Sequence, residues 1–113
     1  MITFDSIRED LVTFTAASGL TAGKPCKISA NGTVSACSED DAFCGVAKQV
    51  RGGLAGVQMH GYVELAYTGT TAPTVGWCGL SADGAGGVQK DADGRAYLVA
   101  KVDTTAGTVG LFL

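Results

Sequence analysis

A hairpin pattern centred on the Gly52-Gly53 pair constrains this chain more than any other feature. Between Phe43 and Leu65, apolar residues alternate with polar or small ones, which is the period of two typical of a β-strand. Two adjacent glycines suit the positive φ angles of a two-residue hairpin turn. The sequence therefore predicts two antiparallel strands joined at this turn. We expect the buried side of the hairpin to comprise Val46, Val50, Val57 and Met59.

The same pattern occurs a second time at the end of the chain. Residues 98–101 (LVAK) align with 45–48 (GVAK), and 107–113 (GTVGLFL) align with 53–59 (GLAGVQM). An earlier segment also repeats, because Cys26 matches Cys78 at a spacing of 52 positions (78 minus 26). We interpret these matches as an internal duplication.

The two halves of the duplication span about residues 19–66 and 73–113. Each follows one plan of short strands, a tight turn, a polar loop and a glycine turn. The segment 67–74 between them is rich in turn residues and is predicted to link the halves.

Short predicted strands separated by turn residues make this an all-β chain. Asn31-Gly32 is the strongest two-residue hairpin signal, and the 17 glycines fit a chain that turns often. No helical periodicity extends beyond a single turn near residues 6–11. We predict a small β-barrel or sandwich with an internal two-fold pseudo-repeat.

One domain is the expected content of 113 residues. We place this single β domain at residues 11–113, after a loose N-terminal arm at residues 1–10. The arm contains the apolar residues Ile2, Phe4 and Ile7, which acidic residues interrupt.

The composition narrows the classes of partner. Hydrophobic residues make up 46% of the chain and charged residues 17%, which favours a folded protein. The net charge is −3 and the Lys and Arg residues are scattered singly, so we expect no nucleic-acid binding. The apolar runs are too short for a membrane span, and the N-terminus lacks the pattern of a secretory signal. We therefore expect no membrane association and no classical export.

The cysteines and other reactive residues give no pattern typical of an active site. Cys26, Cys37, Cys44 and Cys78 lack the paired spacing of zinc sites, so buried reduced thiols are favoured over a disulfide or a metal site. His60 is the single histidine and is interpreted as a surface or turn residue. We predict no catalytic, cofactor-binding or metal site and hence no enzyme.

Two acidic segments and one tryptophan are candidate binding residues. Asp91-Ala92-Asp93-Gly94 resembles the opening of a calcium loop but lacks its further ligands, which favours a turn. Residues 39–41 (EDD) are interpreted as a solvated loop. Trp77 suits a sugar-stacking platform, but a single tryptophan in a strand is more often part of the core.

A series of short phrases runs through the chain in a fixed order. These are residues 10–15 (DLVTFT), 19–25 (GLTAGKP), 44–47 (CGVA), 98–102 (LVAKV) and the strand at 107–113. Together they resemble the small capsid cement, or head decoration, proteins of tailed bacteriophages and prophages. The resemblance covers nearly the whole chain. Cys26 and Cys78 depart from it, at positions that are usually aliphatic in this family.

The resemblance implies a non-enzymatic structural protein of the virion. Such a protein is a small β-barrel that binds the outer surface of the capsid and bridges neighbouring copies of the major capsid protein. It implies a homo-oligomer, with a trimer favoured, that is made in the cytoplasm of the host bacterium and needs no cofactor. Some members carry an N-terminal arm that becomes ordered on the shell. Ile2, Phe4 and Ile7 are therefore candidate capsid contacts, with an extra edge strand as the alternative role of the arm.

A small β-structured module that binds a ligand or a glycan is the alternative function. It would present Tyr62, Tyr67, Trp77 and Tyr97 as exposed aromatic platforms. A hydrolase would instead need paired carboxylates or a nucleophile at suitable spacing, and the sequence provides neither.

Overall fold

A computed structural model describes residues 11–113, and every regular element in this range is a β-strand. The strands are β1 (Leu11–Ala16), β2 (Pro25–Ala30), β3 (Thr33–Ala36), β4 (Gly45–Arg51), β5 (Leu54–Gln58), β6 (Tyr62–Thr68), β7 (Gly76–Ala82), β8 (Val88–Lys90), β9 (Arg95–Asp103) and β10 (Thr108–Phe112). The predicted all-β class is confirmed.

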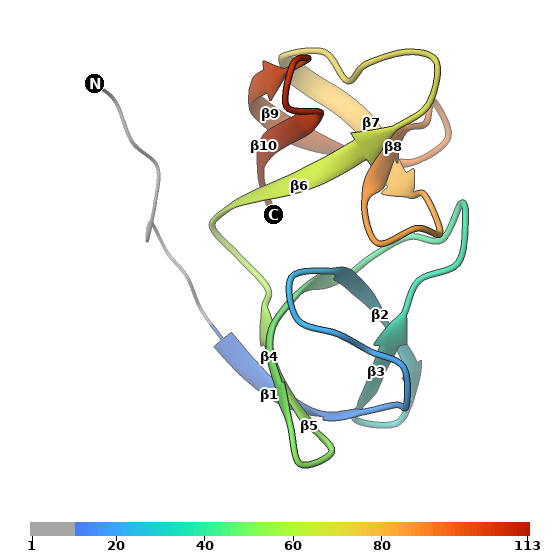
Figure 1. The fold of residues 1–113 in the computed structure, drawn as a ribbon, viewed down its shortest axis with the longest axis vertical. Coiled ribbons are helices and arrows are strands. Elements are labelled where there is room, and N and C mark those ends of the chain that lie inside the picture. Colours follow the sequence, from blue (N-terminus) through green and yellow to red (C-terminus); the bar gives the residue numbers. More distant parts are fainter. Residues whose placement is uncertain (1–10) are drawn as a thin grey trace.

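The ten strands form two closed barrels rather than one (Figure 1). The first barrel has the strand order β1-β3-β2-β4-β5, and the second has the same order, β6-β8-β7-β9-β10. In each barrel the first strand lies parallel to the third and antiparallel to the fifth. Each half of the chain thus closes its own sheet instead of contributing half of a shared barrel.

The structural repeat begins at β1 and at β6, not near residues 19 and 73. β6 pairs with β8 and β10, so residues 62–68 belong to the second barrel. The barrels are joined by residues 59–61, whereas residues 67–74 include the end of β6 and the loop to β7. The alternating pattern of β6 follows that of β5 almost without interruption. Gly61 separates the two strands because its φ angle of 94° turns the chain out of the first sheet.

The register of β4 and β9 differs by one residue from the sequence alignment. Ala47 pairs with Val57, and Val99 pairs with Leu111, and a β-bulge follows each pair. The equivalent residues are therefore Ala47 and Val99, 52 positions apart (99 minus 47). The sequence alignment instead matched Ala47-Lys48 with Ala100-Lys101, which gives a spacing of 53 positions. The predicted match of 53–59 to 107–113 agrees with the pairing of Val57 and Leu111.

Both predicted two-residue turns are present. β2 and β3 flank Asn31-Gly32, and β4 and β5 flank Gly52-Gly53. Gly52 and Gly53 have φ angles of 58° and 77°, as a type I′ turn requires.

Each barrel has its own hydrophobic core. The core of the first barrel contains Leu20, Cys26, Val34, Ala47, Ala55 and Val57. The core of the second contains Phe43, Val46, Val63, Leu65, Cys78, Leu80, Val88, Tyr97, Val99, Val109 and Leu111. Val46 belongs to the second core and Ala47 to the first, because the first three residues of β4 are buried and its start lies against both cores. The expectation that Val46 shares a buried face with Val57 was therefore wrong.

Residues 37–44, between β3 and β4, fasten the two barrels together, and we call them the docking loop. The Asp40 N–H donates to the Ala82 carbonyl (2.9 Å), and the Ala82 N–H donates to the Asp41 carbonyl (2.9 Å). Phe43 then enters the second core. Glu39 and Asp40 are exposed, as expected for a solvated loop, while these backbone hydrogen bonds hold the loop against β7.

Hydrogen bonds from the buried Gln58 side chain also hold the link between the barrels. Gln58 is fully buried, and its Nε2 donates to the carbonyls of His60 (2.9 Å) and Tyr62 (3.1 Å). These bonds hold residues 59–61 in place, so two separate segments of the chain fix one barrel against the other.

Candidate functional site

An apolar patch on the second barrel is the main candidate for a functional surface. Trp77 is 74% exposed, Val75 is 67% exposed and Leu98 is 39% exposed. Trp77 on β7 and Leu98 on β9 are direct cross-strand partners. We call Val75, Trp77, Ala96 and Leu98 the Trp77 patch.

Small residues near Trp77 on β7 and β9 leave its side chain uncovered. The next outward position on β7 is Gly79, which pairs with the exposed Ala96 of β9. Small residues beside the indole ring leave it standing above this part of the sheet. Exposed apolar groups of this kind are typical of binding surfaces, and tryptophan is enriched among residues that dominate binding energy.

The expected place of Trp77 in the core was wrong. The neighbouring residue Cys78 is 4% exposed and faces the second core. Since successive side chains of a strand point to opposite faces, Trp77 must face outward. The alternation predicted a strand here but not which of its two faces is buried.

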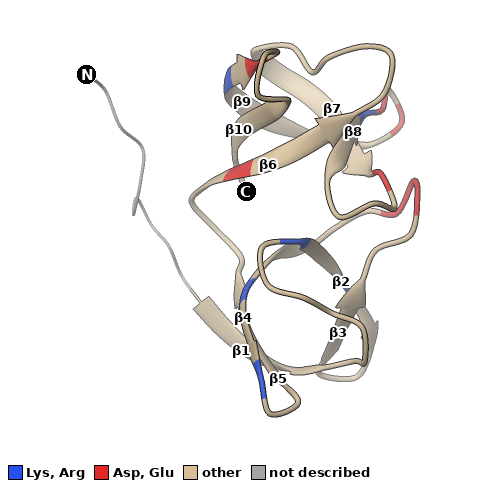
Figure 2. Cartoon of the chain, viewed as in Figure 1, with Lys and Arg blue, Asp and Glu red and all other residues tan. Residues whose placement is uncertain are grey.

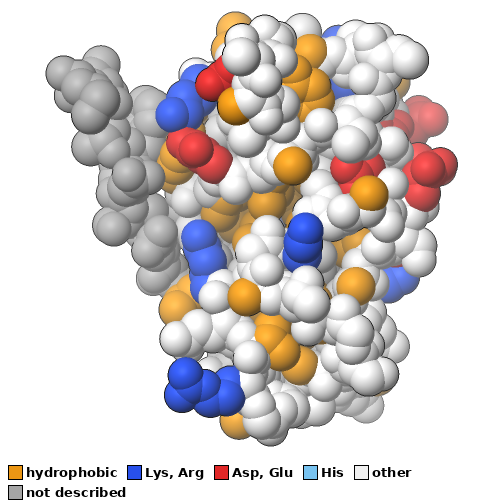
Figure 3. Space-filling view, viewed as in Figure 1, with side chains coloured by type: hydrophobic (Ala, Val, Ile, Leu, Met, Phe, Trp, Pro, Cys, Tyr) orange, Lys and Arg blue, Asp and Glu red, His pale blue; other side chains and the backbone are white. Residues whose placement is uncertain are grey.

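The first barrel presents large apolar side chains of its own. They are Leu11 (54% exposed), Val12 (44%), Ile28 (50%) and Leu54 (53%). The space-filling view shows hydrophobic side chains on the visible face of both barrels (Figure 3). Both halves of the molecule therefore offer apolar surface to a partner.

Charge is distributed unequally between the barrels. Outside the docking loop, residues 11–58 contain four basic residues and no carboxylate, namely Lys24, Lys27, Lys48 and Arg51. The second barrel contains five carboxylates, namely Glu64, Asp83, Asp91, Asp93 and Asp103, against three basic residues. Figure 2 shows acidic residues both in the docking loop and in neighbouring loops of the second barrel.

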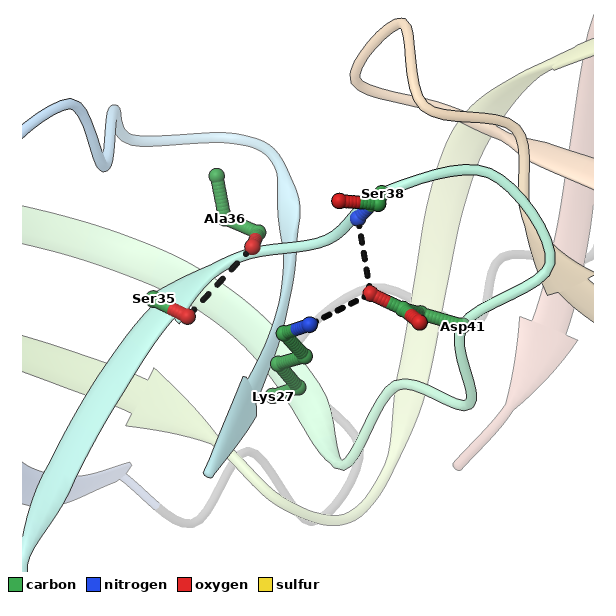
Figure 4. A network of polar contacts seen from close by, with 5 residues as sticks. All are labelled: Lys27, Ser35, Ala36, Ser38 and Asp41. Carbon is green, nitrogen blue, oxygen red and sulfur yellow. Dashed lines mark hydrogen bonds and ion pairs between the residues drawn. The ribbon is translucent and has the colours of Figure 1, made fainter. Parts of the chain in front are cut away.

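A polar network joins the middle of the docking loop to its start and to β2 (Figure 4). Lys27 Nζ on β2 lies 2.6 Å from Asp41 Oδ2, which also accepts a hydrogen bond from the Ser38 N–H (2.8 Å). The Lys27 ammonium, followed by the Ser38 N–H, lowers the pKa of the Asp41 carboxyl. The network fixes the shape of the loop at Asp41.

The Asp91–Gly94 segment is a turn, as predicted. Asp91 Oδ1 accepts the Asp93 N–H (2.9 Å), and the Gly94 N–H donates to the Asp91 carbonyl (3.0 Å). A pocket of about 450 Å³ beside this turn is lined by Asp40, Ser81, Asp91, Asp93 and Arg95, among others. Within residues 11–113, no three His, Cys, Asp or Glu side chains are grouped so that they could hold a metal ion.

The four cysteines are free, and three of them lie close together in the first half. Cys26 is fully buried in the first core, and Cys44 packs against the same core. The Cys26 thiol lowers the pKa of Cys44 to about 7, with help from the backbone N–H groups of Cys44 and Ile28 and against the effect of burial. Burial raises the pKa of Cys37 to about 11. Sequence spacing did not predict this cluster because β2 and β4 meet only in the folded barrel.

The remaining sequence candidates are scattered. His60 is exposed in the link between the barrels, as predicted for a turn residue. Of the four aromatic platforms considered for a glycan, Tyr62 and Tyr97 are buried and Tyr67 is partly buried, which leaves Trp77. Ile2, Phe4 and Ile7, the candidate capsid contacts, lie outside the described residues. In the part of the chain from residue 11 onward, no helix is long and apolar enough to span a bilayer.

Neither a protein-family model nor a curated protein sequence matches this chain.

Proposed function

We propose that this chain is a non-enzymatic capsid decoration protein of a bacteriophage or prophage. It binds the outer surface of the shell and stabilises the shell by bridging neighbouring copies of the major capsid protein. The observation that carries the proposal is the exposed Trp77 patch on a barrel wall. A non-polar protein surface that excludes water from Trp77 and Leu98 would match it.

Bridging requires at least two contact surfaces, and the two barrels supply them. The Trp77 patch lies on the second barrel, whereas Leu11, Ile28 and Leu54 are exposed on the first. The docking loop and Gln58 hold the barrels together, so the two surfaces keep a fixed separation. A rigid pair of contacts on a repeated lattice binds more tightly than either alone, since the second contact forms at high effective concentration.

Association of several copies is the second part of the proposal, with a trimer favoured. The basic first barrel and the more acidic second barrel are electrostatically complementary. Contact between the first barrel of one copy and the second barrel of the next would be head-to-tail, and three such contacts can close a ring.

The N-terminal arm provides a further contact in this proposal. Ile2, Phe4 and Ile7 would bind the shell. A protein lacking residues 1–6 should fold normally, because those residues precede the first barrel, and should bind capsids more weakly. Equal binding by the shortened and full-length proteins would remove the arm from the mechanism.

Co-sedimentation with capsids tests the proposed function directly. Shells assembled from the major capsid protein of the same genome are mixed with increasing amounts of this protein, and the bound copies are counted. We expect saturation at a fixed ratio to capsid subunits, and the ratio would identify the symmetry position occupied. Absence of saturable binding to mature shells would overturn the proposal.

A glycan-binding module is the second candidate, and the exposure of Trp77 also favours it. An exposed indole can stack on a sugar ring. Tyr62 and Tyr97 cannot contribute in this structure because both are buried, so the platform would consist of Trp77 with little aromatic support. A change in tryptophan fluorescence on addition of glycans, together with no binding to capsids, would favour this second function.

A further inference from the structure

The first barrel contains a pair of thiols at the seam between β2 and β4. Only two residue pairs join these strands, Pro25 with Val46 and Cys26 with Gly45. The Cys44 N–H donates to the Cys26 carbonyl (2.8 Å) just beyond the last of these pairs. Cys26 lies in the first core and Cys44 packs against that core, so both residues border the same hydrophobic cluster.

We propose that Cys26 and Cys44 form an intramolecular disulfide when the protein meets a hydroperoxide, and that this bond locks the docking loop between the barrels. The two residues have different roles in this reaction. Cys44 is partly exposed and can be reached by a small oxidant, whereas Cys26 is fully buried.

The chemistry requires one peroxide for each disulfide. The Cys44 thiolate attacks one peroxide oxygen, the O–O bond breaks, and Cys44 becomes a sulfenic acid while hydroxide leaves and is protonated to water. The Cys26 sulfur then attacks the Cys44 sulfur and displaces the second oxygen, which leaves as water with the Cys26 proton. Two thiols are oxidised to one disulfide, and hydrogen peroxide is reduced to two waters.

The surroundings of Cys44 suit the first of these steps. The neighbouring Cys26 thiol lowers the pKa of Cys44, which favours the thiolate form that attacks a peroxide. Cys26 itself keeps its proton, because its pKa is raised by its interaction with Cys44 and by burial. A reactive thiolate next to a resolving thiol is the usual arrangement of a cysteine pair that oxidises reversibly.

The position of Cys44 in the chain gives the disulfide a mechanical consequence. Cys44 directly follows Phe43, which is buried in the second core. A bond from Cys44 to β2 would close the chain around residues 26–44 and so tie the docking loop to the first barrel at its second end. Lys27 and Asp41 already tie it near its middle. Oxidation should therefore stabilise the attachment of one barrel to the other.

The redox environment would then select the state of the protein. In a reducing cytoplasm the thiols remain free, and outside the cell the disulfide would form. This biological setting rests on the proposed capsid function, but the disulfide itself requires no capsid. Its formation is measured on the isolated protein, so failure of capsid binding and failure of the redox chemistry are distinguishable.

The test treats the isolated full-length protein with hydrogen peroxide and maps its cysteines by mass spectrometry. Trypsin cleaves after Lys27, which separates Cys26 from Cys37 and Cys44, and a second digestion at the acidic residues 39–41 separates Cys37 from Cys44. We expect a Cys26–Cys44 cross-link that a thiol reductant removes. Linkage of Cys37 instead, a cross-link between two molecules, or sulfinic acid on Cys44 without a cross-link would each overturn the proposal.

Variants and thermal stability supply the controls. Peroxide should raise the Tm of the wild type by roughly 10 °C, as expected for a disulfide that closes a loop of this length. The variant Cys44→Ser, at a partly exposed position, should fold and show no rise. Cys78→Ser is the matched control, because Cys78 is the counterpart of Cys26 in the second barrel, and it should keep the full rise. An equal peroxide effect on Cys44→Ser and on the wild type would contradict the proposed pair.

Discussion

Phe43, from the first half of the chain, stacks on Tyr97 of the second barrel with ring centroids 4.9 Å apart and an angle of 6° between the rings. The Tyr97 hydroxyl also donates a hydrogen bond to the Phe43 carbonyl (3.1 Å). Both side chains are buried in the second core. The second barrel therefore completes its core with a residue that the first half supplies, which makes the two halves of the duplication interdependent.

The first prediction concerns this stacked pair. Phe43→Ala should lower the free energy of unfolding by about 3–5 kcal/mol, because it leaves a cavity beside Tyr97 in the second core. Phe43→Leu is the matched control and should cost less than about 1.5 kcal/mol, since it keeps most of the apolar volume. Urea unfolding measures both. A Phe43→Ala protein as stable as the wild type would show that the docking loop contributes little to the second core.

The second prediction concerns the Tyr97 hydroxyl. Tyr97→Phe keeps the ring and its stacking but leaves the Phe43 carbonyl without its hydrogen-bond donor. Because that carbonyl lies in a buried contact, the loss should be about 1–3 kcal/mol in the free energy of unfolding. Thermal or urea unfolding at neutral pH provides the measurement, and a change near zero would indicate that another group satisfies the carbonyl.

The third prediction follows from the Lys27–Asp41 ion pair. The pKa of Asp41 is lowered from its ordinary value of 3.8, first by Lys27 and then by the Ser38 N–H. A carboxyl with a lowered pKa in the folded state stabilises the fold above its unfolded pKa, and this contribution is lost as the pH falls through the folded pKa. The stability advantage of the wild type over Asp41→Asn should therefore shrink below about pH 4.

Unfolding of the two proteins across this acidic range checks that prediction. Lys27→Gln removes the largest cause of the pKa shift, and it should reduce the acid dependence that distinguishes the wild type from Asp41→Asn. A constant difference between wild type and Asp41→Asn from neutral to acidic pH would contradict the role given to the ion pair.

The fourth prediction compares two glycines of the central hairpin. A Cβ on Gly45 would collide with the Gln58 carbonyl oxygen and lie 2.9 Å from Val57 Cγ1, whereas the nearest atom to a Cβ on Gly56 is Gln49 Cβ at 3.9 Å. Gly45→Ala should therefore destabilise the fold by about 1–3 kcal/mol, through overpacking against a strand backbone. Gly56→Ala should leave stability nearly unchanged. Similar effects of the two substitutions would mean that β4 and β5 can move apart.

Much of the local structure could be predicted from the sequence because turns and strands have local causes. Gly52-Gly53 and Asn31-Gly32 form turns in the structure as their residue types require. The match between Cys26 and Cys78 also holds, since each is a buried residue of the second strand in its barrel. These features depend on neighbouring residues, so the pattern of a single chain is sufficient to predict them.

The closure of the barrels and the exposed face of β7 depend on distant contacts. Gly45 and Tyr97 occupy equivalent positions in the two barrels, 52 residues apart (97 minus 45). Tyr97 fills the second core, whereas Gly45 lets β4 and β5 approach closely because it has no side chain. Val46 is buried against the second barrel, which no local alternation can indicate. For the same reason, the outward direction of Trp77 and the approach of Cys44 to Cys26 could not be predicted from spacing alone.

The fifth prediction concerns Trp77 as the centre of the capsid contact. Trp77→Ala should weaken capsid binding by about 30-fold or more, the effect of losing a residue worth at least about 2 kcal/mol at the centre of an interface. The fold should be unaffected, because substitutions at exposed positions usually change stability by less than about 0.5 kcal/mol. Lys90→Ala is the control, since Lys90 is exposed on the same barrel but outside the Trp77 patch.

Fluorescence makes this prediction specific, because Trp77 is the single tryptophan of the chain. Burial of an exposed indole shifts its emission to shorter wavelengths. Capsids or capsid fragments without tryptophan are added until binding saturates, and the blue shift of the Trp77 emission should grow with the fraction of protein bound. Binding without any shift, together with normal affinity of Trp77→Ala, would place the contact on the arm or on the first barrel. A shift with a soluble glycan and none with capsids would instead support stacking of the indole on a sugar, since both events bury the same ring.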